Sequence, residues 1–174
     1  MAWHWWSTLL GNGIYTKNVG GAMYIVSSKG IEALKKLEEF RGSAYKDSGG
    51  KLTIGYGHLI KQTEKFTKLT EVEAVALLRS DIKSFEDTVN TAVHVPLLAY
   101  QFDALVIFAF NIGGAAFSGS TLVKLLNAGR YNEAAAQFAR WNKILNATTG
   151  VLEPCRGLTN RRKCELSIYQ GVYP

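Results

Sequence analysis

The sequence predicts an α+β fold that is mostly α-helical, with a small β-hairpin lobe, a larger helical lobe and a cleft between them. Three observations support this class. A turn-rich, strand-like segment follows the first helical pattern, helical periodicity dominates the chain from Thr70 onward, and one helical stretch is apolar on almost every face. The chain has 174 residues, 47% of them hydrophobic and 20% charged, which suits one globular domain with a sizeable core.

Residues 1–26 are expected to be an N-terminal arm or leader, and residues 27–174 to form a single domain. Within that domain the small lobe covers about 27–66 and the helical lobe about 67–174. The arm carries four glycines, and its start, Met-Ala-Trp-His-Trp-Trp, lacks the features of a signal peptide. A gene-fusion leader, the remnant of a membrane anchor and a small aromatic interfacial segment all fit it. We favour a leader that adds little to the chemistry.

The small lobe is predicted to contain one helix and one hairpin. Ser27 or Ser28 is the expected N-cap of the helix, along which apolar residues recur at intervals of three. The helix is expected to end near residues 38–41, with Gly42 as its stop. The Asp-Ser-Gly-Gly sequence at 47–50 is a turn signal between two short strand-like runs, which predicts a β-hairpin.

The helical lobe begins with a capping box formed by Thr70 and Glu73. A long amphipathic helix follows. The apolar residues expected on its buried face are Val72, Val75, Leu78, Ile82, Phe85 and Val89. Pro96 breaks the chain, and residues 99–112 then form a helix that is apolar almost all round and therefore central to the domain. The further predicted helices lie at 121–128, 131–141 and about 159–170.

The formal net charge of +6 suggests an anionic partner, and nucleic acid, anionic lipid and anionic cell-wall polymer all fit it. The basic residues form no nucleic-acid motif, so we expect no specific nucleic acid. No apolar run reaches the ~18 residues of a spanning helix, so no stable membrane insertion is expected. Cys155 and Cys164 match no metal motif and the histidines are scattered, so we expect no metal site. Whether the two thiols are bridged depends on the compartment.

Two carboxylates lie on either side of a predicted chain reversal. Glycoside cleavage requires a proton donor on the leaving oxygen and a second group, usually another carboxyl, that handles the nucleophile. Glu38 lies at the end of the first predicted helix and Asp47 at the hairpin, with eight residues between them. That spacing alone is also compatible with two solvated surface acids.

The full segment from Glu38 to His58 closely resembles the active-site segment of the phage-type lysozymes, the endolysins of glycoside hydrolase family 24. The shared features are the Tyr-Lys-Asp run, the Thr-Ile-Gly-x-Gly-His run and the spacings that link Glu38, Asp47 and Thr53. The resemblance covers about residues 28–172. Its other motifs lie at residues 101–113, 120–127, 138–141 and 157–165.

The resemblance implies a lysozyme-like fold and assigns roles to three residues. Glu38 is the expected general acid, Asp47 the base or water-orienting group, and Thr53 the hydroxyl that positions the attacking water. The product anomer would be inverted, which requires carboxyl groups roughly 6.5–9.5 Å apart. No metal or cofactor is implied.

The same comparison suggests supporting and substrate-binding residues. Arg161 occupies the position that reaches the catalytic glutamate, and His58 a position that is structural in relatives. Asn111 and Phe110 end the central helix where it is expected to meet the cleft, so both are candidates for sugar contact, although Phe110 is equally compatible with core packing. Leu59 follows His58 at a position that can line the cleft.

The resulting expectation is an endolysin that hydrolyses the β-1,4 bond between N-acetylmuramic acid and N-acetylglucosamine in bacterial peptidoglycan. It is expected to be a monomer that stays in the host cytoplasm until it is released to the periplasm and cell wall. An inactive glycan-binding protein and a nucleic-acid-binding domain are the alternatives. The intact set of Glu38, Asp47 and Thr53 argues against the first, and the lack of a nucleic-acid motif argues against the second.

Overall fold

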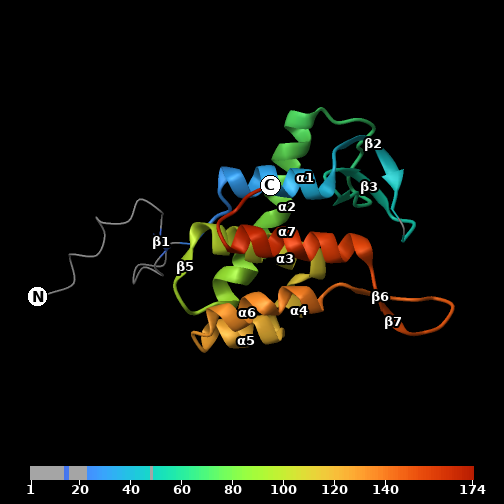
Figure 1. The fold of residues 1–174 in the computed structure, drawn as a ribbon. Coiled ribbons are helices and arrows are strands. Elements are labelled where there is room, and N and C mark those ends of the chain that lie inside the picture. The colour runs from blue at the N-terminus through green and yellow to red at the C-terminus, as the bar shows by residue number, and fades with distance from the viewer. Residues whose placement is uncertain (1–13, 16–22, 48) are drawn as a thin grey trace, which may run out of the picture.

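The computed structural model describes residues 14–15, 23–47 and 49–174, so most of the predicted arm at 1–26 lies outside the described residues. Figure 1 shows a mainly helical molecule with a small sheet at one end, which confirms the predicted fold class. The elements are β1 (Ile14–Tyr15), α1 (Ser28–Glu38), β2 (Arg41–Lys46), β3 (Leu52–Gly55), β4 (His58–Leu59), α2 (Glu71–Ala92), β5 (Leu97–Leu98), α3 (Ala99–Ile112), α4 (Gly114–Ser118), α5 (Thr121–Asn127), α6 (Tyr131–Ala136), the 3-10 helix η1 (Phe138–Arg140), β6 (Lys143–Leu145), β7 (Leu152–Pro154) and α7 (Arg156–Tyr169).

The predicted hairpin is present and forms part of a three-stranded antiparallel sheet in the order β2-β3-β4. Its register pairs Arg41 with Gly55 and Tyr45 with Thr53, with an irregularity between the two pairs. Gly42 does not stop α1 but lies within β2. A Cβ atom at this position would approach the carbonyl oxygen of Leu69 to 3.0 Å, so the glycine permits a close approach of two backbones.

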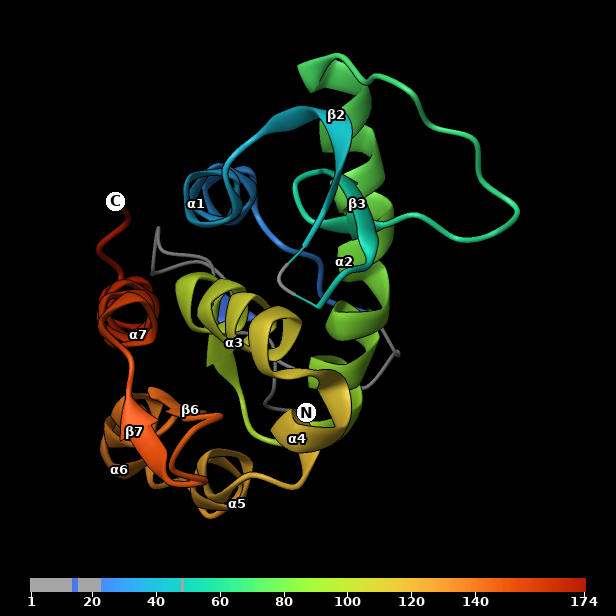
Figure 2. The same cartoon turned by 90° about the vertical axis from the view of Figure 1, so that its right-hand side faces the viewer.

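The helix α2 has the predicted capping box, in which Thr70 and Glu73 satisfy each other's backbone N–H groups. Its buried positions are Ala74, Leu78, Ile82 and Val89. The prediction that Val72 is buried is wrong, because its side chain is 81% exposed. Val72 lies in the first turn, at the end of α2 that extends beyond the sheet in Figure 2.

The central helix α3 has the predicted bounds and buries every residue from Phe102 to Ala109. It packs against α1, α2, α4 and α7, and Figure 2 shows α1 and α7 on one side of it and α2 on the other. Gly113, with φ of 89°, ends the helix. An all-round apolar helix is stable only when neighbouring elements cover each of its faces.

The last part of the chain departs most from the sequence prediction. The helix expected at 131–141 ends at Ala136 and is followed by η1. The final helix, α7, begins at Arg156, three residues earlier than expected. Between them lies the unpredicted β6–β7 hairpin, all of whose strand residues are exposed. This hairpin projects from the body of the molecule in Figure 1.

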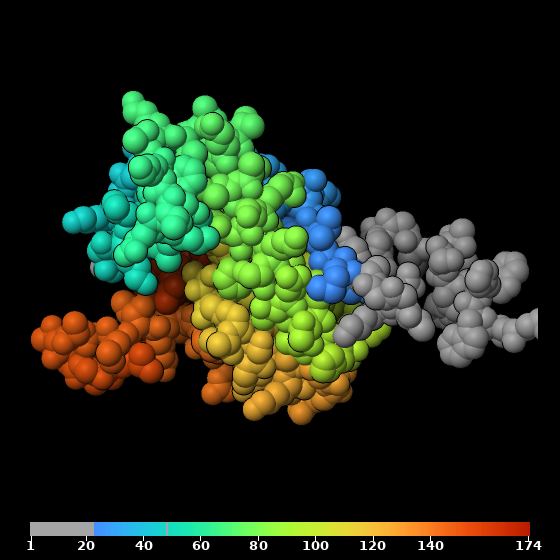
Figure 3. Space-filling view, turned by 180° about the vertical axis from the view of Figure 1, so that it is seen from behind, coloured from blue at the N-terminus to red at the C-terminus, as the bar shows by residue number. Residues whose placement is uncertain are grey.

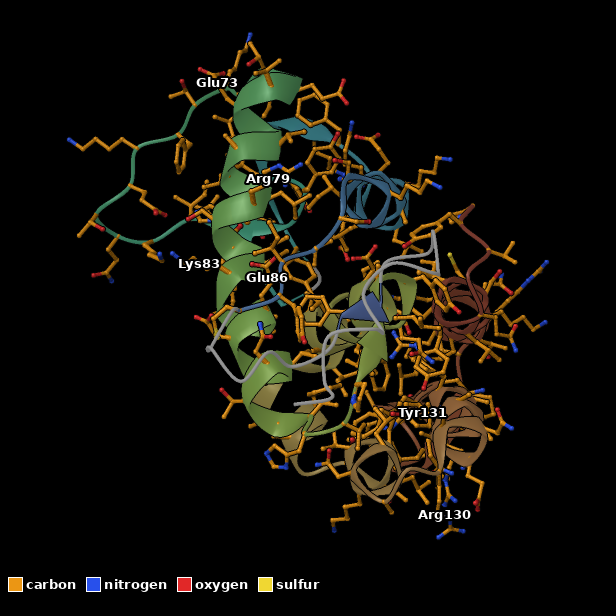
Figure 4. All side chains as sticks on the ribbon, turned by 90° about the vertical axis from the view of Figure 1, so that its left-hand side faces the viewer. Glu73, Arg79, Lys83, Glu86, Arg130 and Tyr131 are labelled. Carbon is orange, nitrogen blue, oxygen red and sulfur yellow. The ribbon has the colours of Figure 1, made fainter. Side chains whose placement is uncertain are left out.

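The described end of the predicted arm packs on the domain. Val26 is only 3% exposed, and its N–H donates to Glu86 of α2 over 2.7 Å. The Asn90 side chain accepts from the backbone N–H of Tyr24 and donates to the Tyr24 carbonyl oxygen. Burial raises the pKa of Glu86, which lies midway along α2 in Figure 4. Residues 23–26 are thus held by α2.

A buried carboxylate links the start of α1 to the central helix and to the C-terminal tail. Asp103 is 1% exposed and accepts the backbone N–H of Ser27 over 2.9 Å and the Tyr173 hydroxyl over 2.6 Å. It also accepts the Ser27 hydroxyl, while that same hydroxyl oxygen caps α1 by accepting from the N–H of Gly30. The position of α1, which carries Glu38, is therefore fixed at its N-terminal end.

Candidate active site

Glu38 is the last residue of α1, and its side chain is 18% exposed. The helix buries Ile31 and Leu34 in the core, which sets the direction in which its C-terminal end points. Glu39, the next residue, has φ of 53° and ψ of 137°. This conformation costs a non-glycine residue about 1–3 kcal/mol, and such strain concentrates at functional sites. Glu39 itself is exposed.

The Glu38 carboxylate is held by α7. Arg161 donates from Nη2 to Glu38 Oε1 over 2.7 Å, and the Arg161 side chain is only 11% exposed. The other Glu38 oxygen faces the small sheet, since a Cβ atom at Gly57 would lie 3.7 Å from Oε2. Gly57 has φ of 86° and lies in the turn between β3 and β4. One carboxyl oxygen is thus anchored, and the other is directed toward the sheet.

Arg161 is shared with a second, fully buried carboxylate. Its Nε donates to Glu165 Oε1 over 3.1 Å, and Glu165 is 0% exposed. Arg162 also donates to Glu165 Oε1, over 3.0 Å, and to the side-chain oxygen of Asn111. Burial raises the pKa of Glu165 to about 7, against the opposing effect of the two arginines. The guanidinium of Arg162 lies 4.9 Å from the ring centroid of Phe108.

Asp47 directly follows β2 and lies half-buried at the start of the hairpin turn. Its Oδ1 accepts the backbone N–H of Gly49 over 2.9 Å and that of Lys51 over 2.8 Å. Aspartate forms such turns because its side chain reaches the backbone two residues ahead. The two hydrogen bonds converge on Oδ1 and so fix the direction of Oδ2.

Thr53 lies on β3, where its side chain is 3% exposed. Its hydroxyl donates to the carbonyl oxygen of Lys51 over 3.2 Å. Lys51 therefore contacts both predicted residues, because its N–H binds Asp47 and its carbonyl accepts from Thr53. The structure thus links Asp47 with Thr53 through one residue of the hairpin, and Glu38 with Arg161 through an ion pair.

The predicted substrate-binding residues have different environments. Leu59 lies on β4 and is 46% exposed. Asn111 is exposed at the end of α3, where it accepts a hydrogen bond from Arg162. Phe110 is half-buried and packs edge-to-face against Phe85, with ring centroids 5.3 Å apart. Its ring is therefore engaged by α2, a contact that fits core packing.

His58 is buried on β4 between two carboxylates. Its Nδ1 is 2.9 Å from Asp81 and its Nε2 is 3.0 Å from Glu64. Burial lowers the pKa of His58, but hydrogen bonds to Glu64 and Asp81 outweigh this effect, and the pKa is raised overall. Both ring nitrogens are engaged, which fits a structural role.

The structure adds two charged residues to which the sequence reasoning gave no role, Arg162 and Glu165. The signal was available, because residues 161, 162 and 165 stand at helical spacings of three and four that allow ion pairs on one helix. Cys155 and Cys164 are both free thiols. Across the described residues, no group of three or more histidine, cysteine or acidic side chains is arranged to hold a metal ion.

The surface is hollowed next to these residues. Figure 3 shows a depression between the small sheet and the projecting β6–β7 hairpin, with α7 at its floor. The end of α1, the hairpin turn of β2–β3 and the start of α7 come together on this side of the molecule. A surface depression bordered by elements that carry carboxylates is an arrangement able to act on a polymeric glycan.

Comparison with known protein families identifies the class. The family model described as phage lysozyme matches residues 35–165, so the chain belongs to the phage lysozyme family. It is therefore a glycoside hydrolase of the muramidase type.

Individual relatives agree with this assignment. The chain is 38% identical over 147 residues to an endolysin of Acyrthosiphon pisum secondary endosymbiont phage 1, which covers 84% of this chain and 99% of the relative. It is 41% identical over 125 residues to the endolysin of Salmonella phage P22, covering 70% of this chain and 86% of that one. Among solved structures, an endolysin from Escherichia coli O157:H7 phage FAHEc1 matches with a TM-score of 0.81 and 37% identity, over 88% of this chain and 98% of the other.

Proposed function

We propose that this muramidase hydrolyses the β-1,4 bond between N-acetylmuramic acid and N-acetylglucosamine with inversion at the anomeric carbon. Glu38 is the general acid, Asp47 the base and Thr53 the group that positions water. One observation carries the proposal. The Glu38 carboxylate is anchored by Arg161 through one oxygen and directs the other toward the sheet whose hairpin bears Asp47 and Thr53.

In a single displacement, protonated Glu38 donates its proton to the glycosidic oxygen as the bond to the anomeric carbon breaks. The ion pair with Arg161 fixes the orientation of the carboxyl, which general acid catalysis requires. The same cation favours ionised Glu38. A compensating influence is therefore needed for the acid to keep its proton.

As that bond breaks, a water molecule attacks the anomeric carbon from the opposite face. Its proton passes to Asp47, whose Oδ1 is occupied by two backbone N–H groups, so that Oδ2 is the oxygen that accepts it. The Thr53 hydroxyl holds the water oxygen in line. Because the leaving group and the nucleophile lie on opposite faces, the configuration inverts.

The stereochemistry provides the test. Soluble peptidoglycan fragments are digested in an NMR tube, and the anomeric proton of the new reducing end is recorded before mutarotation. The proposal predicts that the α-anomer appears first. Initial appearance of the β-anomer would mean retention of configuration, and would exclude Asp47 as a base acting through water.

The setting of the reaction is also a proposal. The net charge of +6 suits a polyanionic wall, and we place the enzyme in the host cytoplasm until it is released to the periplasm and cell wall. We expect it to act as a monomer. No helix among the described residues is long and apolar enough to cross a membrane.

A further inference from the structure

We propose that Glu165 is a positioning residue that keeps the proton on Glu38 by sharing the guanidinium of Arg161 with it. The inference rests on the proposed role of Glu38 as general acid. It assigns a function to a buried charge that the catalytic scheme above does not use.

The geometry places one cation between two carboxylates. Arg161 uses Nη2 for Glu38, over 2.7 Å, and Nε for Glu165, over 3.1 Å. The two contacts come from different nitrogens of one planar group, so Arg161 is oriented by Glu165 while it holds Glu38. Glu165 makes no direct contact with the reacting atoms and therefore acts through Arg161.

The charges around this group explain why a second anion is needed. Those acting on Glu165 are Arg161 and Arg162 from its own helix and Glu38 from α1. The neighbouring elements α3 and η1 add no charge here. Phe108 of α3 lies next to Arg162, and Phe138 of η1 lies next to Tyr169 and Phe108, and both are buried, uncharged aromatic rings. When Glu38 carries its proton, only ionised Glu165 balances the two arginines. Without that anion the proton on Glu38 faces two unpaired cations, which favours its loss.

Burial makes this influence strong and sensitive to pH. Glu165 is 0% exposed and Arg162 is 2% exposed, so water screens their charges little. The pKa of Glu165, raised to about 7 by burial, means that it becomes an anion as the pH rises through neutrality. Ionised Glu165 therefore offsets part of the positive charge that Arg161 and Arg162 direct at Glu38.

The first experiment compares pH profiles of kcat/KM on soluble peptidoglycan fragments for the wild type, Glu165→Gln and Glu133→Gln. Glutamine preserves the shape of the side chain and an oxygen for Arg161, but removes the charge. Glu133→Gln makes the same change in net charge at an exposed ion pair on α6, whose partner Arg130 is labelled in Figure 4. We expect the alkaline limb of Glu165→Gln to move to lower pH by about one pH unit. The Glu133→Gln profile should superimpose on the wild type.

An unchanged alkaline limb in folded Glu165→Gln, with only a lower plateau, would overturn the proposal, because a structural role alone lowers the plateau. The substitution leaves Arg162 buried without its carboxylate, and this variant is the one that could fail to fold. A measurement on the unsubstituted protein keeps the proposal testable in that event. Glutamate labelled with carbon-13 at the carboxyl is incorporated, and the Glu38 and Glu165 signals are assigned with Glu38→Gln and followed through a pH titration.

The expected result is coupling, in which the Glu38 signal shifts a second time at the pH where Glu165 titrates. A single independent step for Glu38 would overturn the proposal. This titration requires no turnover, so it is separate from the test of Glu38 as general acid. If Glu38→Gln retained activity, the proposed function would fail whatever the titration showed.

Discussion

The replacement Glu38→Gln removes the transferable proton and changes little else. Glutamine has the size of glutamate, and its side-chain oxygen can still accept the hydrogen bond that Arg161 donates over 2.7 Å. The end of α1 is held mainly by buried apolar residues such as Leu34, which the substitution does not touch. We therefore expect a folded variant with a specific chemical defect.

The size of the defect follows from the role of the proton. General acid catalysis contributes about 10²–10⁴-fold to rate, which corresponds to about 2.7–5.4 kcal/mol in the activation barrier. A glycosidic oxygen is a poor leaving group without protonation. We therefore expect the loss to reach the upper end of this range, about 10⁴-fold.

The matched control is Glu39→Gln, one residue further along the chain. It makes the same change in net charge, but the Glu39 side chain is exposed. The positive φ of 53° is unfavourable for glutamate and glutamine alike, so the substitution adds no new backbone strain. We expect this variant to keep its activity within about twofold, in the range of ordinary surface substitutions.

Both variants are assayed by initial rates of clearing of purified peptidoglycan at one ionic strength, because salt screens the attraction of a basic protein to the wall. Circular dichroism checks that each is folded. If folded Glu38→Gln kept more than about a tenth of the wild-type rate, the loss would be smaller than the contribution of general acid catalysis, and the assignment of Glu38 as the general acid would be wrong. Equal losses in the two variants would mean that the assay reports attraction to the wall.

Three further predictions concern stability and the N-terminal segment. Asp103→Asn should lower the free energy of unfolding by about 2–4 kcal/mol in urea titrations. The reason is that an amide cannot accept from all the donors that face this buried carboxylate. An unchanged free energy of unfolding would contradict this role of Asp103. The raised pKa of His58 stabilises the fold fully below about pH 6.5, and this contribution is lost as the pH rises through the higher folded-state value. Thermal unfolding should therefore show the gap between the wild type and His58→Gln narrowing above that pH, and a widening gap would contradict the assignment. Removal of residues 1–22 should leave wall-clearing activity within about threefold, because this segment lies outside the matched motifs. Removal of residues 1–26 should in addition lower thermal stability, because Val26 is buried. Equal thermal stability of the two truncated proteins would show that the contacts of residues 23–26 with α2 do not stabilise the fold.

The parts of the fold that could be predicted from the sequence are those set by local rules. The capping box at Thr70 and the bounds of α3 follow from side-chain chemistry and periodicity within one segment. The β6–β7 hairpin was missed because its apolar residues, such as Leu145 and Leu152, are exposed and give no burial pattern. The end of α1 at Glu38 lies within the predicted range, but Gly42 is not its stop. The helix ends where Glu39 adopts a positive φ, which no sequence rule assigns to glutamate.

The residues of the candidate site also fall into two groups, those that belong to one local motif and those that only the packing of the helices brings together. Glu38, Asp47 and Thr53 belong to one continuous motif, and the resemblance of that motif to the phage lysozymes assigned their roles. The contact between Arg161 and Glu38 joins residues 123 positions apart, and resemblance to the phage lysozymes, not local pattern, made it predictable. The sharing of Arg161 with Glu165 could not be predicted, because it depends on how α7 packs and on which of its charged residues are buried.

The most direct test of the central claim is the chemical nature of the product. Purified peptidoglycan is digested by the unsubstituted protein in water enriched in heavy oxygen, and the muropeptides are analysed by mass spectrometry. Hydrolysis by activated water predicts reducing N-acetylmuramic acid ends that carry one heavy oxygen at the anomeric carbon, and no such ends with Glu38→Gln. Products with an anhydro-muramic end and no incorporated oxygen would contradict the account, because water would then not be the nucleophile.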